Sequence, residues 1–547
     1  MRPVRSAIVQ EPCQDQNGGG VEDIVFLHGD HAREHAARST TCTGTKEYAM
    51  SATDSGRSRS SVEDPNVAKK LRRKVIALSI AAALGGFLFG FDSSVINGAV
   101  KAIESNFNLG DLPLLSGFTV ASALLGCAIG AYFAGRIADR IGRIPVMLIG
   151  AGLFLVSSIG SGFAFAVWDL ILWRVIGGLG IGIASVIAPA YIAEIAPKAV
   201  RGGLASLQQL AITLGIFAAL LSDTLLQAAA GGADQPLWFG ADAWRWMFVA
   251  CAVPAIVYGL LAWRLPESPR YLAGKNRNDD ARDVLTSVMP QDEVDSALAE
   301  IEQSLKEDRE NARTASLRGK MFGLLPVVWV GILLSMFQQL VGINVIFYYS
   351  TSLWSSVGFD TGNSSTSFTI SVVTSIINVA VTFVAIYFVD KVGRRPLLLT
   401  GSAGMVVSLG AMAVAFSQAV VVDGAPQLPG AWGPIALVGA NLFVIFFGAT
   451  WGPIVWVLLG EIFPNRIRGK ALGIAAAAQW LTNFAITETF PALSGFSLAF
   501  TYGLYTFFAL VSFVFVFFAV PETKGRSLES MDSLKVVRKR DREVQPQ

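Results

Sequence analysis

The sequence predicts an all-α membrane protein with twelve transmembrane helices in two six-helix halves. Three observations predict this class: 52% of the residues are hydrophobic and only 15% are charged, long apolar runs recur along the chain, and three short motifs occur twice. A soluble chain of 547 residues would carry far more charge on its surface. The bilayer is therefore the first expected partner of this protein.

Three motif pairs carry the duplication. DRIGRIPV at 139–146 matches DKVGRRPLL at 390–398, AEIAPKAVRGGL at 193–204 matches GEIFPNRIRGKAL at 460–472, and PESPR at 266–270 matches PETKG at 521–525. The pairs keep the same order and similar spacing, so chance is a poor explanation. A parallel repeat joined by a polar stretch is typical of secondary transporters, which bind substrate near the membrane midplane between the halves.

Each apolar run is about 20 residues long, which at 1.5 Å per helical residue crosses the ~30 Å hydrocarbon layer. The expected spans are 76–97, 114–134, 145–167, 171–191, 204–223 and 245–264 in the first half, and 323–349, 368–389, 397–418, 434–459, 470–491 and 497–520 in the second.

Composition divides the chain into five parts: a disordered cytoplasmic tail (1–70), the first half (71–270), a cytoplasmic helical linker (271–320), the second half (321–522) and a cytoplasmic tail (523–547). The first tail is polar and has no apolar run that would suit a signal peptide, and Met50 is an alternative start. Near-helical spacing of apolar residues predicts short amphipathic helices in the linker. Lys and Arg gather in alternate loops, which places both termini in the cytoplasm.

Two ionisable residues stand out within the spans. Asp92 lies in the middle of the first span and Arg174 early in the fourth. A charge at the bilayer centre costs about 2.5–3.5 kcal/mol on insertion scales. Each of these residues is therefore expected to have a partner or a function. A carboxylate that breaks and re-forms its contact with an arginine as the protein changes conformation would gain and lose a proton. Such a pair could couple proton binding to the conformational change. A static ion pair between the two spans is the alternative.

Uncharged amides are concentrated in the seventh span, where Gln338, Gln339 and Asn344 fall within seven residues. Amides donate and accept hydrogen bonds, as sugar hydroxyls do, so these side chains are expected to line a cavity; hydrogen bonds between helices are the alternative. Gly452 and Pro453 should loosen the tenth span beside Trp456, which would then act at a gate or simply pack. Further polar or aromatic candidates are Gln208, Gln209, Asn378, Gln479, Trp480 and Asn483.

With these motifs placed, the chain resembles the sugar porter family of the major facilitator superfamily over about residues 72–530, and most closely its bacterial proton-coupled sugar symporters. The signatures are GGFLFGFDSSVINGA, GRIADRIGRIPV, WRVIGGLGIGIASVIAPAYIAEIAPKAVRG, PESPRYL, QQLVGINVIFYYS, VDKVGRRPL, WGPIVWVLLGEIFPNRIRGKA and PETKGRSLE. The resemblance implies the major facilitator fold.

The resemblance also implies roles for individual residues. Proton-coupled members carry an aspartate at the position of Asp92, where facilitative animal glucose transporters typically carry a neutral residue. The implied sugar ligands are Gln209, Gln338, Gln339, Asn344, Asn378, Trp456, Gln479 and Trp480, with Phe89 as an apolar contact. An inner gate is implied for Arg136, Asp139, Arg143, Glu194, Arg201, Asp390, Arg394, Glu461 and Arg468.

The expected function is import of a hexose or pentose by proton symport through alternating access, in the plasma membrane. A facilitative sugar uniporter and a polyol or inositol symporter remain open, and a non-transporting nutrient sensor is a third, more distant alternative. The chain contains no phosphate loop, positioned nucleophile or metal-ligand spacing, so we expect no enzyme activity, cofactor or metal. We also expect a monomer with no nucleic-acid partner.

Overall fold

The computed structural model describes residues 65–197, 201–314, 317–319, 322–360, 366–422, 425–464 and 467–524. The first helix begins at Pro65, inside the range 1–70 that the sequence assigned to the tail. Proline is favoured at the first helical position because its missing N–H would be unpaired there in any case. Residues 1–64 lie outside the described part, so the disorder expected for them stays a prediction.

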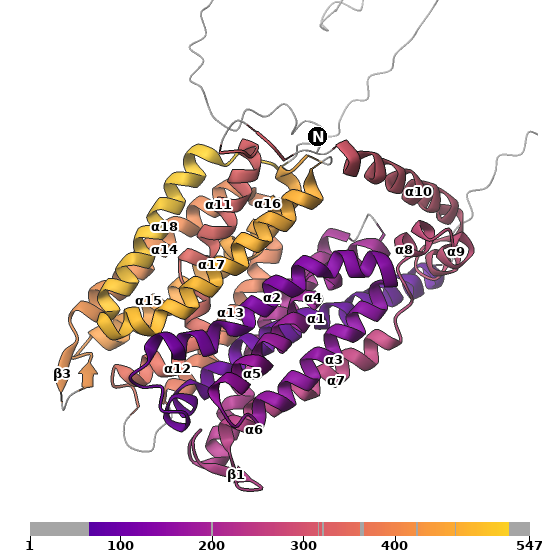
Figure 1. The fold of residues 1–547 in the computed structure, drawn as a ribbon. Helices are drawn as coiled ribbons and strands as arrows, with labels where there is room; N and C mark the ends of the chain where they lie inside the picture. Colours follow the sequence, from indigo (N-terminus) through magenta and orange to yellow (C-terminus); the bar gives the residue numbers. More distant parts are fainter. Residues whose placement is uncertain are drawn as a thin grey trace, which may run out of the picture. The chain divides into compact units, whose positions relative to one another are not determined.

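The helices follow one another with short connections (Figure 1). The first half contains α1 (Pro65–Asn106), α2 (Pro113–Ile141), α3 (Arg143–Gly162), α4 (Val167–Ile195), α5 (Arg201–Ala230), α6 (Ala243–Ala250) and α7 (Ala252–Trp263). The linker contains α8 (Pro269–Gly274), α9 (Asn278–Thr286) and α10 (Gln291–Thr314). The second half contains α11 (Pro326–Leu340), α12 (Ile343–Ser356), α13 (Thr366–Val392), α14 (Arg394–Ser417), α15 (Trp432–Phe446), the π-helix η1 (Phe447–Trp451), α16 (Gly452–Ile462), α17 (Arg468–Phe496) and α18 (Leu498–Ala519).

Within the described residues, eleven helices are long and apolar enough to cross a membrane, counting α6 with α7, α11 with α12, and α15 with η1 and α16 as single spans. The twelfth long helix is α17, which has 29 residues but too many polar ones to pass on hydropathy. Gln479, Asn483 and Thr487 are buried in it. Because α17 packs against α2 and α11 rather than only against lipid, it tolerates these polar side chains.

Small residues bring α2 and α4 into close contact. A Cβ added at Gly126 would lie 2.2 Å from the Val175 carbonyl oxygen, and one added at Gly178 would lie 2.0 Å from that of Ala123. Such backbone approach is the usual way for membrane helices to associate, since lipid supplies no hydrophobic drive between them. These glycines therefore fix α2 against α4 within the first half.

The two halves meet along three helix pairs: α1 with α12, α2 with α17, and α5 with α13. Two antiparallel hairpins, β1 (Pro236–Trp238) with β2 (Ala241–Asp242) and β3 (Val420–Val422) with β4 (Ala425–Gln427), lie at one end of the bundle. We call this the hairpin end. The linker helices lie at the other end, which we call the linker end (Figure 1).

The linker helices form a small core of their own, as their spacing of apolar residues predicts. Leu285 and Leu298 are buried in it, and Val284, Ile301 and Leu305 pack against it. Val288 instead joins the main core of the bundle. The expected short helices between the halves are thus present.

Candidate transport site

Asp92 on α1 and Arg174 on α4 form a buried ion pair in the first half. Arg174 Nη1 lies 3.1 Å from Asp92 Oδ1, and both residues are less than a tenth exposed. A second guanidinium nitrogen, Nη2, donates to the Val120 carbonyl oxygen at 3.4 Å. Arg174 Nε has no hydrogen-bond partner among the described residues. The pair is therefore held by one short contact and leaves donor capacity unused.

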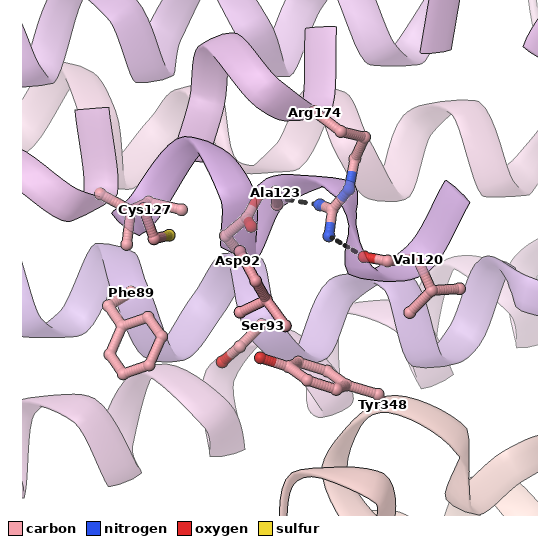
Figure 2. Close-up of a pocket in the computed structure, with 10 residues that line it drawn as sticks. Phe89, Asp92, Ser93, Val120, Ala123, Cys127, Arg174 and Tyr348 are labelled. Atoms are coloured by element: carbon pink, nitrogen blue, oxygen red, sulfur yellow. Dashed lines mark hydrogen bonds and ion pairs between the residues drawn. The ribbon is translucent and has the colours of Figure 1, made fainter. Parts of the chain in front are cut away.

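Figure 2 shows what surrounds the pair. A cavity of about 10 Å³, close to the size of one water molecule, is lined by Asp92, Arg174, Ser93, Phe89 and Cys127 among others. Tyr348 completes the lining and comes from α12 in the second half, with its hydroxyl toward Ser93 in the view. The ion pair thus lies where the two halves meet, and the sequence did not predict this role for Tyr348.

The three amides of the seventh span form one hydrogen-bonded chain. Asn344 Nδ2 donates to Gln339 Oε1 at 2.7 Å, and Gln339 Nε2 lies 3.5 Å from Gln338 Oε1. The chain crosses a helix break, since α11 ends at Leu340 and α12 begins after Gly342, whose φ of +79° favours glycine. The break turns neighbouring amides toward one another.

Gln338 joins this chain to a second break, in the tenth span. Its Nε2 donates to the carbonyl oxygens of Trp451 at 2.9 Å and Gly452 at 3.1 Å, where η1 gives way to α16. Non-helical backbone at membrane depth persists only where its polar groups find other partners. Gln338 therefore serves helix packing as well as facing the amide chain.

The other predicted ligands lie on α1, α5, α13, α16 and α17. Asn378 on α13 is buried against η1, since a Cβ at Gly448 would lie 3.3 Å from its Oδ1. Trp480 on α17 meets Phe89 on α1 edge to face, with ring centroids 5.4 Å apart, across the boundary between the halves. Gln479 Oε1 is buried with no partner among the described residues. Gln209 is partly buried and Trp456 is 44% exposed.

At the hairpin end, α1 and α12 are joined by polar contacts that the sequence did not single out. Asn97 Nδ2 donates to Ser350 Oγ at 2.8 Å, and the Thr351 backbone N–H donates to Asn97 Oδ1 at 2.9 Å. Nearer the surface, Lys101 Nζ lies 2.5 Å from Ser355 Oγ. The halves are therefore fastened together at this end.

At the linker end of the first half, the three duplicated motifs come together in one cluster. Arg143, at the start of α3, forms a two-point ion pair with Glu194, at the end of α4, at 2.9 and 3.1 Å. Ser268 Oγ donates to Glu194 Oε2 at 2.5 Å. Glu267 accepts the backbone N–H groups of Arg143 and Ile144, as expected of a carboxylate at a helix N-terminus.

The second half repeats this cluster bond for bond. Arg394 pairs with Glu461 at 2.8 and 3.1 Å, Thr523 Oγ1 donates to Glu461 Oε2 at 2.6 Å, and Glu522 accepts the backbone N–H groups of Arg394 and Arg395. Gly142 and Gly393, which precede the two arginines, both have φ of +106°, a conformation that glycine adopts without strain. The residues that repeat in the sequence therefore form the same contacts in both halves.

The pKa of Glu522 reflects this position beyond the end of α18. Partial burial would raise the pKa of its carboxyl group, but backbone N–H groups of Lys524, Arg394, Arg395 and Thr523 donate to it and lower the pKa below its ordinary value.

Two of the predicted gate residues lie apart from these clusters. Arg136 is exposed and stacks over the Tyr132 ring at 4.5 Å, while Arg468 donates to the Phe463 carbonyl oxygen at 3.2 and 3.3 Å. Asp139 is mostly exposed and pairs with Arg143 one turn later. The side chains of Arg201 and Asp390 lie outside the described residues. The pairs of Arg143 with Asp139 and Glu194, and the pair of Arg394 with Glu461, join helices of the same half.

A duplicated helical bundle with a buried ion pair and an amide-lined boundary between its halves defines a membrane transporter that works by moving one half against the other. The chain belongs to the sugar transporter family: the family described as "Sugar (and other) transporter" matches residues 78–534. The predicted family membership is confirmed, and the family is one of transporters, not enzymes.

Individual relatives are similar over nearly their whole length. A glucose transport protein of Synechocystis sp. is 54% identical over 459 residues, which is 84% of this chain and 97% of that protein. A D-xylose-proton symporter of Escherichia coli is 37% identical over 491 residues, 84% of this chain and 95% of that protein. The solved inward-open structure of the xylose transporter from E. coli matches with a TM-score of 0.71 and 35% identity, covering 84% of this chain and 99% of that one. This likeness confirms the predicted two-half, twelve-helix fold.

Proposed function

We propose that this protein imports a monosaccharide, a hexose or a pentose, together with a proton. The relatives named above transport glucose or D-xylose, and one of them does so with a proton. We further propose that it resides in the plasma membrane with both termini and the linker end in the cytoplasm, so that the hairpin end faces outward. The alternation of Lys and Arg between loops supports this orientation.

The observation that carries proton coupling is the single-point contact of Asp92 with Arg174. Removing one member of a buried ion pair leaves the other charge uncompensated, which is costly. A proton that reaches Asp92 from outside neutralises the carboxylate and frees the Arg174 guanidinium to donate to other acceptors. When the halves have rocked and the site faces inward, Arg174 pairs with Asp92 again and the proton leaves.

The amide chain supplies the sugar site in this proposal. Gln339, Asn344 and Gln479 offer donors and acceptors at the boundary between halves, with Gln209, Gln338 and Asn378 nearby. Trp456, Trp480 and Phe89 offer apolar faces for the C–H side of a pyranose. Tyr348 follows Asn344 by one turn on α12 and lines the cavity beside Asp92, so in this proposal sugar and proton bind close enough to influence one another.

The linker-end clusters hold the helices of each half together, in our proposal, so that each half moves as one body and closes the inner end. Surface ion pairs are individually worth about 0–1 kcal/mol, but several acting together bias a two-state equilibrium. Asp139, Arg143, Glu194, Arg394 and Glu461 would act in this way, with Arg136, Arg201, Asp390 and Arg468 nearby in sequence.

The test is counterflow of labelled D-glucose, D-xylose, L-arabinose and myo-inositol in proteoliposomes, repeated with and without a proton gradient. Counterflow of a monosaccharide, with accumulation only when the outside is acidic, is expected. Equal uptake with and without the gradient would identify a uniporter, and preference for inositol would identify a polyol carrier. Binding of sugar without counterflow would favour a sensor.

A further inference from the structure

A second carboxyl group is buried in the first half and takes no part in the mechanism above. Asp223 lies on α5 and is 0% exposed. Among the described residues, neither of its oxygens has a hydrogen-bond partner of ordinary geometry; the backbone of Gly98 on α1 is the polar group that approaches it. A Cβ added at Gly98 would lie 2.8 Å from Asp223 Oδ2, so only glycine leaves room for the carboxyl group there.

No charged group described on the helices packed against α5 forms an ion pair with Asp223. On α1, Asp92 pairs with Arg174, Lys101 contacts Ser355, and Glu104 accepts from Ser116. On α4, Asp169 accepts the Phe165 N–H; on α6, Arg245 donates to the carbonyl oxygens of Gly162 and Ala164, and Asp242 precedes that helix. The charged side chain described on α13, Lys391, lies at the last turn of that helix. None of these groups forms a described ion pair or hydrogen bond with Asp223.

An unpaired ionised carboxylate in an apolar interior costs far more than a neutral carboxylic acid. Asp223 is therefore far more stable with a proton in this conformation. A fully buried acid without a partner is a poor structural element, since an apolar residue of similar size would pack there without that restriction. The ability of Asp223 to bind a proton, rather than its packing, therefore explains an aspartate at this position.

A path connects Asp223 to the hairpin end. A pocket of about 250 Å³ lies there between the halves, lined by Gly98, Lys101, Gln227, Thr351, Ser355 and Asp360 among others. Gln227 follows Asp223 by one helical turn and has a buried Oε1 without a described partner, so it can orient water between pocket and acid. Gly98 separates the pocket from Asp223.

The ion pair lies farther along α1 from the pocket than Gly98, which contacts Asp223. Gly98 lies less than two turns beyond Asp92 on α1, about 9 Å along a helix. Cys251, at the break between α6 and α7, lies within electrostatic range of both carboxyl groups. The order along the bundle is therefore pocket, Asp223, Asp92.

We propose that Asp223 is a second proton-binding group of the transporter, which receives a proton from the pocket at the hairpin end and passes it to Asp92. In the transfer, the Asp223 O–H bond breaks, an O–H bond forms on Asp92, and Arg174 is released. The bare Asp223 carboxylate that remains takes the next proton from water in the pocket. The inference rests on the proposed proton coupling and adds the route by which the proton arrives.

The test compares wild type, Asp223→Asn and the control Asp111→Asn in proteoliposomes with labelled D-glucose and D-xylose. Asp111 is exposed in the loop between α1 and α2, so its variant removes a carboxylate at the same end without touching the path. An amide mimics a protonated acid in shape but releases no proton. Asp223→Asn should keep counterflow and lose acid-driven accumulation with its dependence on outside pH, while Asp111→Asn behaves as wild type.

The proposal is overturned if Asp223→Asn accumulates sugar with the pH dependence of wild type. If wild type itself exchanges sugar but never accumulates it, the proposed proton coupling is wrong instead. A second measurement then tests the protonation of Asp223 separately. The infrared carbonyl band of a protonated carboxyl group, present in purified wild type and absent from Asp223→Asn, would show the bound proton; an unchanged band would refute it. Should the amide variant not fold, Asp223→Ser is compared in the same assays.

Discussion

Thr351 of the second half is hydrogen-bonded to Asn97 of the first through both main chain and side chain. Its backbone N–H donates to Asn97 Oδ1, and its hydroxyl lies 2.6 Å from the Asn97 main-chain oxygen and 2.7 Å from Oδ1. In the proposed orientation, opening outward separates α1 from α12 at this end. These contacts are therefore part of the free-energy difference between its conformations.

Asn97→Ala should shift the protein toward states that are open at the hairpin end. The variant removes the contacts of the Asn97 side chain to Thr351 and Ser350, each net worth about 0.5–1.5 kcal/mol, so the equilibrium should change by about tenfold or more. A cysteine placed at Ser105, which lines the pocket there, should react faster with a water-soluble thiol reagent. Equal reaction rates in Asn97→Ala and its parent would mean that the closure depends on other contacts. Ser356→Ala is the control, because Ser356 lies on α12, as Thr351 does, and among the described residues its hydroxyl bonds only to Leu353 of its own turn.

Asp92→Asn should abolish accumulation against a gradient while counterflow remains measurable. The amide stands for the protonated acid and cannot recover the charge that holds Arg174, so the cycle no longer needs a proton. Accumulation and counterflow are measured side by side in proteoliposomes at several outside pH values. A variant that still concentrates sugar in a pH-dependent way would show that the proton binds elsewhere.

Gln338→Ala and Asn344→Ala should differ in effect because only Gln338 bonds to the broken tenth span. Losing Gln338 leaves the carbonyl oxygens of Trp451 and Gly452 without that donor, a cost of about 1–3 kcal/mol that should lower both thermal stability and sugar affinity. Asn344→Ala should weaken sugar binding with a smaller loss of stability. Thermal unfolding in detergent and sugar-binding titrations separate the two. Loss of stability in both variants with unchanged affinity would assign the amide chain to packing alone.

Arg394→Ala should weaken the helix contacts at the linker end more than Arg468→Ala does. Arg394 bonds twice to Glu461, and hydrogen bonds to charged groups are worth about 1.5–3 kcal/mol each when well shielded, whereas Arg468 bonds to a backbone carbonyl. Arg143→Ala should have a similar effect, because it removes the corresponding two bonds to Glu194 in the other half. Thermal stability and labelling of a cysteine at the linker end provide the measurements. A stronger effect from Arg468→Ala would mean that the inner closure uses contacts other than the two clusters.

Glu522→Gln should lower thermal stability at neutral pH and lose that effect in acid. The pKa of Glu522 is lowered in the folded protein, so its charge stabilises the fold fully above its ordinary value of 4.5. That contribution is lost as the pH falls below 4.5 and through the lowered folded value. Melting temperatures of both proteins from pH 7 down to pH 3 should therefore converge. A constant difference across this range would show that the carboxylate acts through its shape and not through its charge.

Much of the architecture follows from the sequence because hydropathy and duplication can be recognised in the residues without knowledge of their contacts. Twenty apolar residues must form a helix in a bilayer, since no water is present to satisfy their backbone. The helix α17 illustrates the limit, because buried polar residues such as Gln479 and Asn483 hide a spanning helix from hydropathy. The sequence nonetheless predicts this span, at 470–491, because most residues of that segment are apolar over a length of about 20.

The partners of individual charges were decided by tertiary structure. The sequence marks Glu461 and Arg468 as neighbours in one motif, but the structure pairs Glu461 with Arg394, 67 residues earlier. Which arginine meets a carboxylate depends on how the helices pack, and that packing is set by small residues such as Gly126 and Gly178. The contact of Asn97 with Thr351 likewise exists only because the halves dock along α1 and α12.

The sequence by itself determined the class of fold, the duplication, and two candidate coupling residues, Asp92 and Arg174, since an ionisable residue in an apolar run is conspicuous without coordinates. Asp223 also lies in an apolar run, yet nothing local distinguishes it from an acid near a membrane surface. Only the tertiary structure placed it against Gly98, with no hydrogen bond or ion pair to a base among the residues that the structure describes. Burial and isolation are properties of the packed bundle, because they depend on what the other helices bring to the same place.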